Sequence, residues 1–170
     1  DGDPVAACAA VNRRMRRLFV SAFQSEIFNA VLARRLDTID RLLPGDIARK
    51  CDTGGVFRVE DPAAEQPRAD RFAVSPTGPL PGYRCMIAEQ EAGAIERAVF
   101  DERGIDPAAL KKTGSLKIKG TRRPLRFPLH DPHLDTGTDD GGAYVAVSFG
   151  APSGCYATVV TDEIIKENDT

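Results

Sequence analysis

The hydrophobic pattern is clearest in the stretch that follows residue 20. Four apolar residues recur there three or four positions apart: Phe23, Ile27, Ala30 and Val31. This spacing places them on one face of a helix, which we predict over residues 22–36 with that face in a core. Ser21 followed three residues later by Gln24 matches a capping box, in which the two side chains satisfy free backbone N–H groups. The pattern therefore predicts Ser21 as the cap that precedes this helix.

The other side of this predicted helix is rich in amide and hydroxyl groups. It carries Gln24, Ser25, Asn29 and Arg34. Groups that both donate and accept hydrogen bonds suit a neutral polar surface such as nucleobase edges or sugar hydroxyls. The alternative is that these residues tie the helix to neighbouring loops, and spacing alone favours that alternative.

Turn residues and alternating patterns predict several further elements. Residues 74–82 are rich in proline and glycine, which predicts a rigid loop because proline removes a backbone donor and fixes φ. The stretch after Cys155 fits a helix capped by Ser153, with a strand as the alternative because residues 158–161 are β-branched. The other predictions, in order, are a short basic helix capped by Asn12, strands at 47–49 and 55–59, a loop at 60–71, a helix at 93–103 stopped by Gly104, a short helix from Asp106, strands at 116–119 and 125–129, an acidic loop at 131–142 and a strand at 143–149.

Mixed helices and short strands indicate an α+β fold, and the 170-residue chain is long enough to bury a core as one domain or two small units. The net charge of −2 gives no general attraction to nucleic acid. Two runs are nevertheless basic and free of acids, residues 11–20 and 107–130. Local basic runs favour binding to a polyanion, although a solvated basic face is the common alternative. The second run includes Lys117, Lys119, Arg122 and Arg123.

The cysteines and histidines give little sign of metal chemistry. Four cysteines lie far apart, which predicts reduced and mostly buried thiols in a cytoplasmic protein. His130, Asp131 and His133 could begin a zinc site in a metal-dependent hydrolase, but no further ligand cluster stands near them in the sequence. We therefore predict no metal site. No apolar run reaches the length of a membrane span.

Tyr156 is the most distinctive single residue. It stands beside Gly154 where the alternating strand passes into the last predicted helix. An aromatic side chain at such a junction can stack on an unstacked RNA base. The alternative is a half-buried core tyrosine with a hydrated hydroxyl group.

Four stretches, taken in order, resemble motifs of one family. Residues 21–29 resemble S-A-[YF]-Q-S-x-x-F-N, residues 76–82 resemble P-T-G-P-L-[FP]-G, residues 120–124 resemble G-x-R-R, and residues 152–158 resemble P-x-G-x-[FY]-A-T. These are motifs of the TruD family of tRNA pseudouridine synthases. The resemblance spans the chain from about Arg13 to Ile165.

The resemblance implies two regions and a reaction. Residues 1–119 correspond to the α/β insertion domain of the family, incomplete at its N-terminus, and residues 120–170 to the C-terminal strands and helix of the catalytic domain. The partner is tRNA, and a uridine in its D arm, uridine 13, is flipped out and isomerised without a cofactor. Tyr156 matches the active-site aromatic near the target base. The RNA-contacting residues that we predict are Tyr156, Gln24, Ser25, Asn29, Arg122, Arg123, Lys117 and Lys119.

The chain also departs from the family pattern. The catalytic aspartate of the family belongs to a G-T-K-D motif well upstream of the predicted helix, and these 170 residues do not contain that motif. The sequence Gly137-Thr138-Asp139 stands in the wrong place to replace it. Asp162-Glu163-Ile164 also stands where the family often has Arg-Glu-Leu. We therefore expect a C-terminal portion of such an enzyme, inactive alone, or else a non-catalytic RNA-binding module with the same fold.

Overall fold

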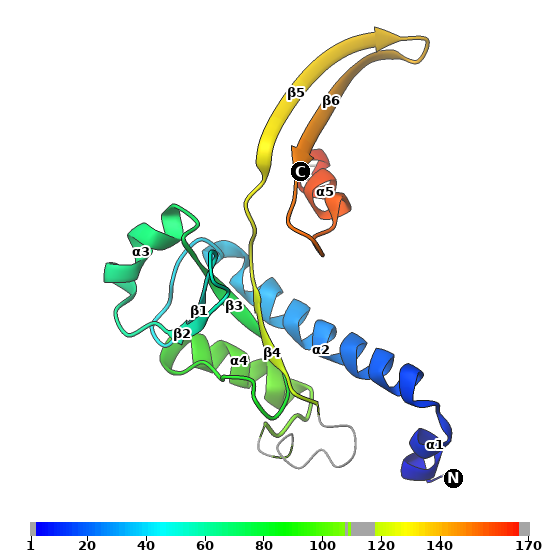
Figure 1. Cartoon of the computed structure of the whole chain (residues 1–170), viewed down its shortest axis with the longest axis vertical. Helices are drawn as coiled ribbons and strands as arrows, with labels where there is room; N and C mark the ends of the chain where they lie inside the picture. The colour runs from blue at the N-terminus through cyan, green and yellow to red at the C-terminus, as the bar shows by residue number, and fades with distance from the viewer. Residues whose placement is uncertain (1–2, 108, 110–117, 167–170) are drawn as a thin grey trace. The chain divides into compact units, whose positions relative to one another are not determined.

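The structure is a computed structural model that describes residues 3–107, 109 and 118–166. It divides into two compact units, Asp1–Arg126 and Phe127–Thr170. Helices and strands are mixed along the chain, which confirms the predicted α+β class (Figure 1). Within the described residues, no helix is both long and apolar enough to cross a membrane.

Unit 1 begins with a short helix α1 (Pro4–Ala10) and the long helix α2 (Arg13–Arg35). The side chain of Asn12 accepts a hydrogen bond from the Met15 N–H at 2.9 Å, which confirms the predicted cap. The capping box at Ser21 is wrong, because Ser21 lies inside α2. The arginines and leucine before it are good helix formers, so nothing separates the basic segment from the helix that follows.

The sheet of unit 1 has the strand order β2-β1-β3-β4, with every neighbouring pair antiparallel. Strands β1 (Ile47–Lys50) and β2 (Val56–Arg58) confirm the predicted ribbon. The proline-rich stretch is strand β3 (Val74–Leu80), so its prediction as a loop is wrong. β1 pairs with its first half and β4 (Thr121–Pro124) with its second half. Each half of β3 is therefore hydrogen-bonded to one neighbouring strand. Prolines, which have no N–H to donate, can be accommodated where a residue is not required to donate to a partner strand.

Two helices lie between strands of the sheet in the sequence. The predicted loop at 60–71 is wrong, because helix α3 (Pro62–Asp70) begins there. Asp61 caps α3 by accepting from the N–H groups of Ala63 and Ala64, and Pro62 suits the first helical position. Helix α4 (Gln90–Glu102) confirms the predicted second helix but begins three residues earlier. Gly104, at φ +61°, ends it as predicted.

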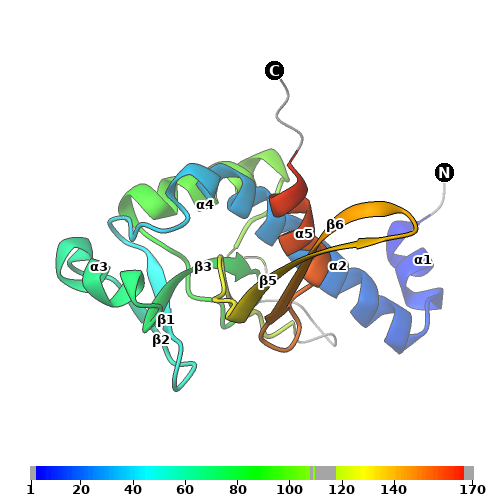
Figure 2. The same ribbon diagram turned by 90° about the horizontal axis from the view of Figure 1, so that it is seen from above.

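The core lies where α2 packs against α4 and β3, and α2 and α4 run side by side in Figures 1 and 2. Ile27 and Val31 are buried as predicted, whereas Phe23 is 45% exposed and lies outside the core. A second apolar cluster lies between the sheet and α3 and contains Leu42, Ala48, Val59, Ala69 and Val74. A short 3-10 helix, η1 (Leu36–Thr38), follows α2, and the buried Arg35 guanidinium there binds the Asp46 carboxylate at 2.9 Å.

Unit 2 consists of a hairpin and a helix. Strand β6 (Gly142–Gly150) confirms the predicted strand with alternating apolar residues. The stretch after Cys155, for which helix and strand were both open, is helix α5 (Ala157–Ile165). The acidic stretch is strand β5 (His130–Asp139), so its prediction as a loop is wrong. Pairing with β6 supplies its hydrogen bonds, and the register shifts between His130 and His133, around Pro132.

Three smaller predictions concern the joins between elements. Ser153 does not cap α5, because Tyr156 is the N-cap residue and makes no side-chain cap bond. The strand predicted at 125–129 is wrong, since β4 ends at Pro124. Residues 116 and 117 of another predicted strand, and most of the short helix predicted from Asp106, lie outside the described residues.

Candidate functional site

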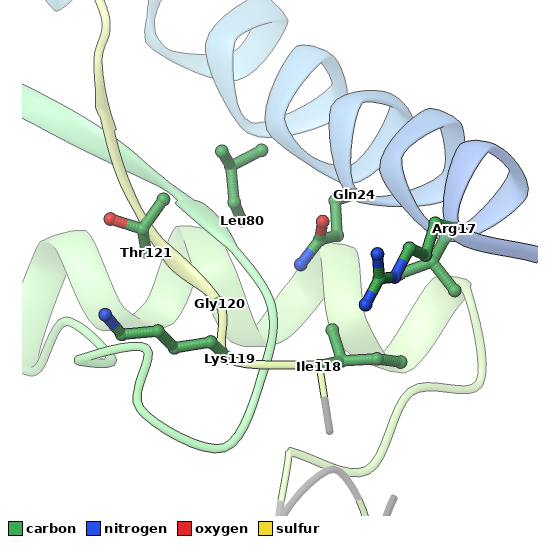
Figure 3. Close-up of a pocket in the computed structure, with 8 residues that line it drawn as sticks. Arg17, Gln24, Leu80, Ile118, Lys119, Gly120 and Thr121 are labelled. Carbon is green, nitrogen blue, oxygen red and sulfur yellow. The ribbon is translucent and has the colours of Figure 1, made fainter. Parts of the chain in front are cut away.

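A pocket of about 440 Å³ opens in unit 1 beside helix α2. Its walls come from the N-terminal half of α2, the end of β3 and the segment that leads into β4 (Figure 3). The residues that line it are Arg17, Val20, Gln24, Leu80, Ile118, Lys119, Gly120 and Thr121. Two residues predicted from the sequence, Gln24 and Lys119, are thus brought to one place.

Two glycines let the chain cross itself beside the pocket. A Cβ at Gly82 would lie 2.3 Å from the Gly120 nitrogen, and a Cβ at Gly120 would lie 2.6 Å from the Gly82 nitrogen. Gly120 also has φ +67°, a conformation that favours glycine. The Tyr83 and Arg84 N–H groups then donate to the carbonyl oxygens of Ile118 and Lys119 at 2.9 and 2.8 Å. The proline-rich motif and the G-x-R-R motif therefore meet in one backbone junction.

Gln24 is fixed in the pocket wall by this junction. Its Nε2 donates to the Pro81 carbonyl oxygen at 2.7 Å, so the amide orientation is set. Figure 3 shows Gln24 and Arg17 projecting from α2 toward the segment Ile118–Thr121. The Gln24 carbonyl oxygen is then the atom of this side chain that can accept from a ligand.

The described lining of the pocket contains two cations and no acid. Arg17 and Lys119 are both exposed, and Val20, Leu80 and Ile118 supply apolar surface between the polar groups. Such a combination favours an anionic ligand that also has an apolar face.

Arg122 lies in the interior of unit 1. Its guanidinium donates to the Glu96 carboxylate and the Thr77 carbonyl, each at 2.6 Å, and to the Thr77 hydroxyl and the Met86 carbonyl, each at 2.9 Å. With 3% exposure the residue has no surface for a phosphate. The structure therefore gives Arg122 a supporting role beneath the pocket and not the RNA contact that the sequence predicted.

The other predicted residues are spread more widely. Arg123 is exposed, and its guanidinium lies 5.0 Å from the centre of the Phe28 ring. Asn29 is exposed and Ser25 half-buried on α2, and neither lines the pocket. Lys117 lies outside the described residues. Tyr156 belongs to unit 2, where it is 74% exposed at the start of α5.

The Cys85 thiol contacts one of the residues that line the pocket. It donates to the Thr121 carbonyl oxygen at 3.1 Å. Burial raises the pKa of the Cys85 thiol, although the nearby Arg122 guanidinium opposes the shift. The group therefore stays protonated at neutral pH and is a poor nucleophile. Cys8 and Cys51 are exposed, so the prediction of mostly buried thiols is wrong.

The histidines of β5 do not belong to a larger group of ligands. Among the residues that the structure describes, no cluster of three or more histidine, cysteine, aspartate or glutamate side chains could hold a metal ion. His133 lies 3.3 Å from Asp135 in an exposed pair.

Tyr83 and Arg84 are residues that the sequence prediction missed. The Tyr83 side chain is 37% exposed, and the Arg84 guanidinium lies 5.6 Å from its ring centre. The sequence feature that could have identified them is their position directly after Gly82, the glycine that ends the proline-rich motif.

Comparison with known proteins identifies the family. The family model for tRNA pseudouridine synthase D (TruD) matches residues 1–164. The chain belongs to the TruD family. It is 46% identical over 160 residues to the tRNA pseudouridine synthase D of Geobacter metallireducens and 44% identical over 160 residues to that of Geobacter sulfurreducens. Each match covers 94% of this chain, and 39% and 38% of the relatives respectively.

A comparison with solved structures points to the same family. A crystal structure from Methanosarcina mazei, of a protein described as a candidate TruD, matches with a TM-score of 0.78 and 28% identity. The match covers 94% of this chain and 40% of that one. The chain thus spans about two fifths of the length of these TruD proteins.

Proposed function

We propose that this chain is part of a tRNA pseudouridine synthase that converts uridine 13, in the D arm of tRNA, to pseudouridine. The observation that carries the proposal is the TruD family match over residues 1–164, together with two relatives of that name at 46% and 44% identity. The substrate is tRNA, and the reaction takes place in the cytoplasm.

The reaction is an isomerisation, so it needs no oxidant, reductant or cofactor. The N1–C1′ bond of the flipped uridine breaks, the base turns, and a C5–C1′ bond forms while a proton leaves C5 and another is taken up at N1. The catalytic aspartate of the family is expected upstream of Asp1. This chain alone is then inactive, and Tyr156 lies near the target base in the complete enzyme.

The role that we assign to the described residues is to hold RNA. Arg17 and Lys119 supply positive charge at the pocket, and the fixed amide of Gln24 supplies a neutral acceptor. Phosphate contacts from exposed arginine and lysine position an RNA without reading its sequence. Ser25, Asn29 and Arg123 lie outside the pocket, and we assign them further RNA contacts. All these residues belong to the insertion domain, residues 1–119, and the adjoining β4.

The proposal is tested by restoring the upstream region. A protein extended upstream of Asp1 to include a G-T-K-D motif, taken from the Geobacter metallireducens relative if necessary, is incubated with unmodified tRNA. Pseudouridine is then located by chemical labelling and primer extension. We expect modification at uridine 13, none in a tRNA with cytidine at that position, and none with the 170-residue chain. Failure of the folded, extended protein to form pseudouridine would remove the proposal.

A second candidate is a non-catalytic RNA-binding module. The observation that favours it is the pocket itself, whose exposed Arg17 and Lys119 and fixed Gln24 amide can bind RNA without any catalytic group. Genomic sequence upstream of Asp1 distinguishes the two candidates. An open reading frame with the G-T-K-D motif supports the enzyme, and a start codon close to Asp1 supports the binding module.

A further inference from the structure

The backbone junction at Gly82 and Gly120 holds Tyr83 and Arg84 in place. Both N–H groups are hydrogen-bonded to the segment that lines the pocket, at 2.9 and 2.8 Å. Because Gly82 is packed against backbone atoms of Ile118 and Gly120, the two side chains leave the junction from a constrained backbone. They are therefore positioned by the same contacts that shape the pocket.

The chemistry of this pair differs from that of an ordinary basic surface. The tyrosine ring is 37% exposed and carries a guanidinium 5.6 Å from its centre. An aromatic ring and an arginine plane are the two side-chain surfaces on which an unstacked nucleobase stacks. With 37% of its surface exposed, Tyr83 keeps part of its side chain accessible to a ligand, and Arg84 beside it is exposed as well.

The surroundings favour RNA over a small apolar ligand. Arg17 and Lys119 lie in the adjacent pocket and suit phosphate oxygens, and no acidic residue lines the described part of it. Tyr83 and Arg84 do not line this pocket, but their backbone N–H groups bind the carbonyl oxygens of Ile118 and Lys119 in its wall.

We propose that Tyr83 and Arg84 form a stacking platform for one unstacked base, and that Arg17 and Lys119 bind the flanking phosphates of a single-stranded RNA segment. This inference rests on the proposed function, since it names the form in which tRNA meets this region: a loop nucleotide out of its helical stack. A base-paired stem cannot use the platform, because both faces of its bases are already stacked.

The test measures binding of fluorescently labelled heptauridylate to the 170-residue chain by anisotropy, at several salt concentrations. Tyr83→Ala is expected to weaken binding about ten-fold or more, and Tyr83→Phe, which keeps the ring, to change it less than about two-fold. Arg17→Ala and Lys119→Ala are each expected to reduce the slope of log K against log salt by about 0.7, as for one lost phosphate contact to a single strand.

Two controls separate the platform from general charge or loss of fold. Lys50→Ala removes an exposed lysine of β1 that does not line the pocket, and it should leave the slope unchanged. A seven-base-pair RNA duplex should bind the wild type and Tyr83→Ala equally. Urea unfolding of each variant checks that the fold is intact.

The results distinguish the platform from the proposed function. If folded Tyr83→Ala binds heptauridylate as the wild type does, or if the wild type does not bind it at low salt, the platform is contradicted, even where the extended protein makes pseudouridine. If Tyr83→Ala loses binding as expected while the extended protein makes no pseudouridine, the platform stands and the proposed function fails.

Discussion

The Arg122 guanidinium donates to the Glu96 carboxylate at 2.6 Å, between side chains that are 1% and 3% exposed. The same guanidinium binds the Thr77 hydroxyl and carbonyl, and the second oxygen of Glu96 accepts from the Ala88 N–H. This buried pair thus joins β4, β3 and α4 beneath the pocket. The second arginine of the family's G-x-R-R segment, Arg123, is the one that reaches the surface.

Replacing one partner of the Arg122–Glu96 pair should lower the stability of the fold. Glu96→Gln or Arg122→Ala leaves a buried charged or polar group without its partner, and we expect a loss of about 3–5 kcal/mol in the free energy of unfolding. Urea denaturation followed by circular dichroism measures it. The matched control is Arg103→Ala, which breaks an exposed pair with Glu26 and should cost less than about 1 kcal/mol. Similar losses for the two pairs would contradict a structural role for Arg122.

The crossing of the two glycine segments should tolerate no side chain. In Gly82→Ala the new Cβ would lie 2.3 Å from a backbone nitrogen, so the backbone must move, and we expect about 1–3 kcal/mol of destabilisation with loss of heptauridylate binding. Gly55→Ala is the control, because its nearest neighbour would be the Thr53 hydroxyl at 3.6 Å and its φ does not require glycine. Wild-type stability and binding in Gly82→Ala would show that the crossing does not shape the site.

The sequence predicted the elements whose signal is local, but it did not predict the strands that depend on a partner strand elsewhere in the chain. The core positions Ile27 and Val31, the ribbon of β1 and β2, and helix α4 follow from local spacing. β3 and β5 were predicted as loops, because proline content and acidity are local signals, whereas each strand is stabilised by a partner elsewhere in the chain. Strand pairing of that kind cannot be read from one segment alone.

Tyr156 should matter for catalysis and not for stability. Its side chain is 74% exposed, so Tyr156→Ala should change the free energy of unfolding by less than about 0.5 kcal/mol. In the protein extended upstream, we expect pseudouridine formation to fall about 10- to 100-fold through loss of stacking on the base, and Tyr156→Phe to retain most of it. An alanine variant with wild-type activity would assign Tyr156 to the surface alone.

Cys85 should react slowly while the chain is folded. Its raised pKa lowers the fraction of thiolate, which is the form that reacts. At pH 8, alkylation of Cys85 by iodoacetamide, followed by mass spectrometry of peptides, should be several-fold slower in the folded chain than in urea. The rate should rise with pH well above 8, where the thiolate begins to form. Equal rates in the folded and unfolded chain would contradict the burial of this thiol.

Only some residues of the candidate site could be predicted from the sequence. Gln24 and Lys119 were predicted from hydrogen-bonding capacity and from a basic run, and the structure brings them to one pocket. Arg122 and Arg123 look equivalent in that run, but alternation along β4 turns one side chain into the core and the other outward. Tyr83 was missed, and Arg17 was not singled out within its basic run, because their places depend on contacts between distant segments: Gln24 with Pro81, and Gly82 with Gly120.

The most direct measurement of the central claim is the location of pseudouridine in tRNA treated with the protein extended upstream of Asp1. We predict modification at uridine 13 that depends on the upstream aspartate and that weakens when Arg17 and Lys119 are replaced by alanine. A folded, extended protein that leaves every uridine of the tRNA unchanged would contradict the account.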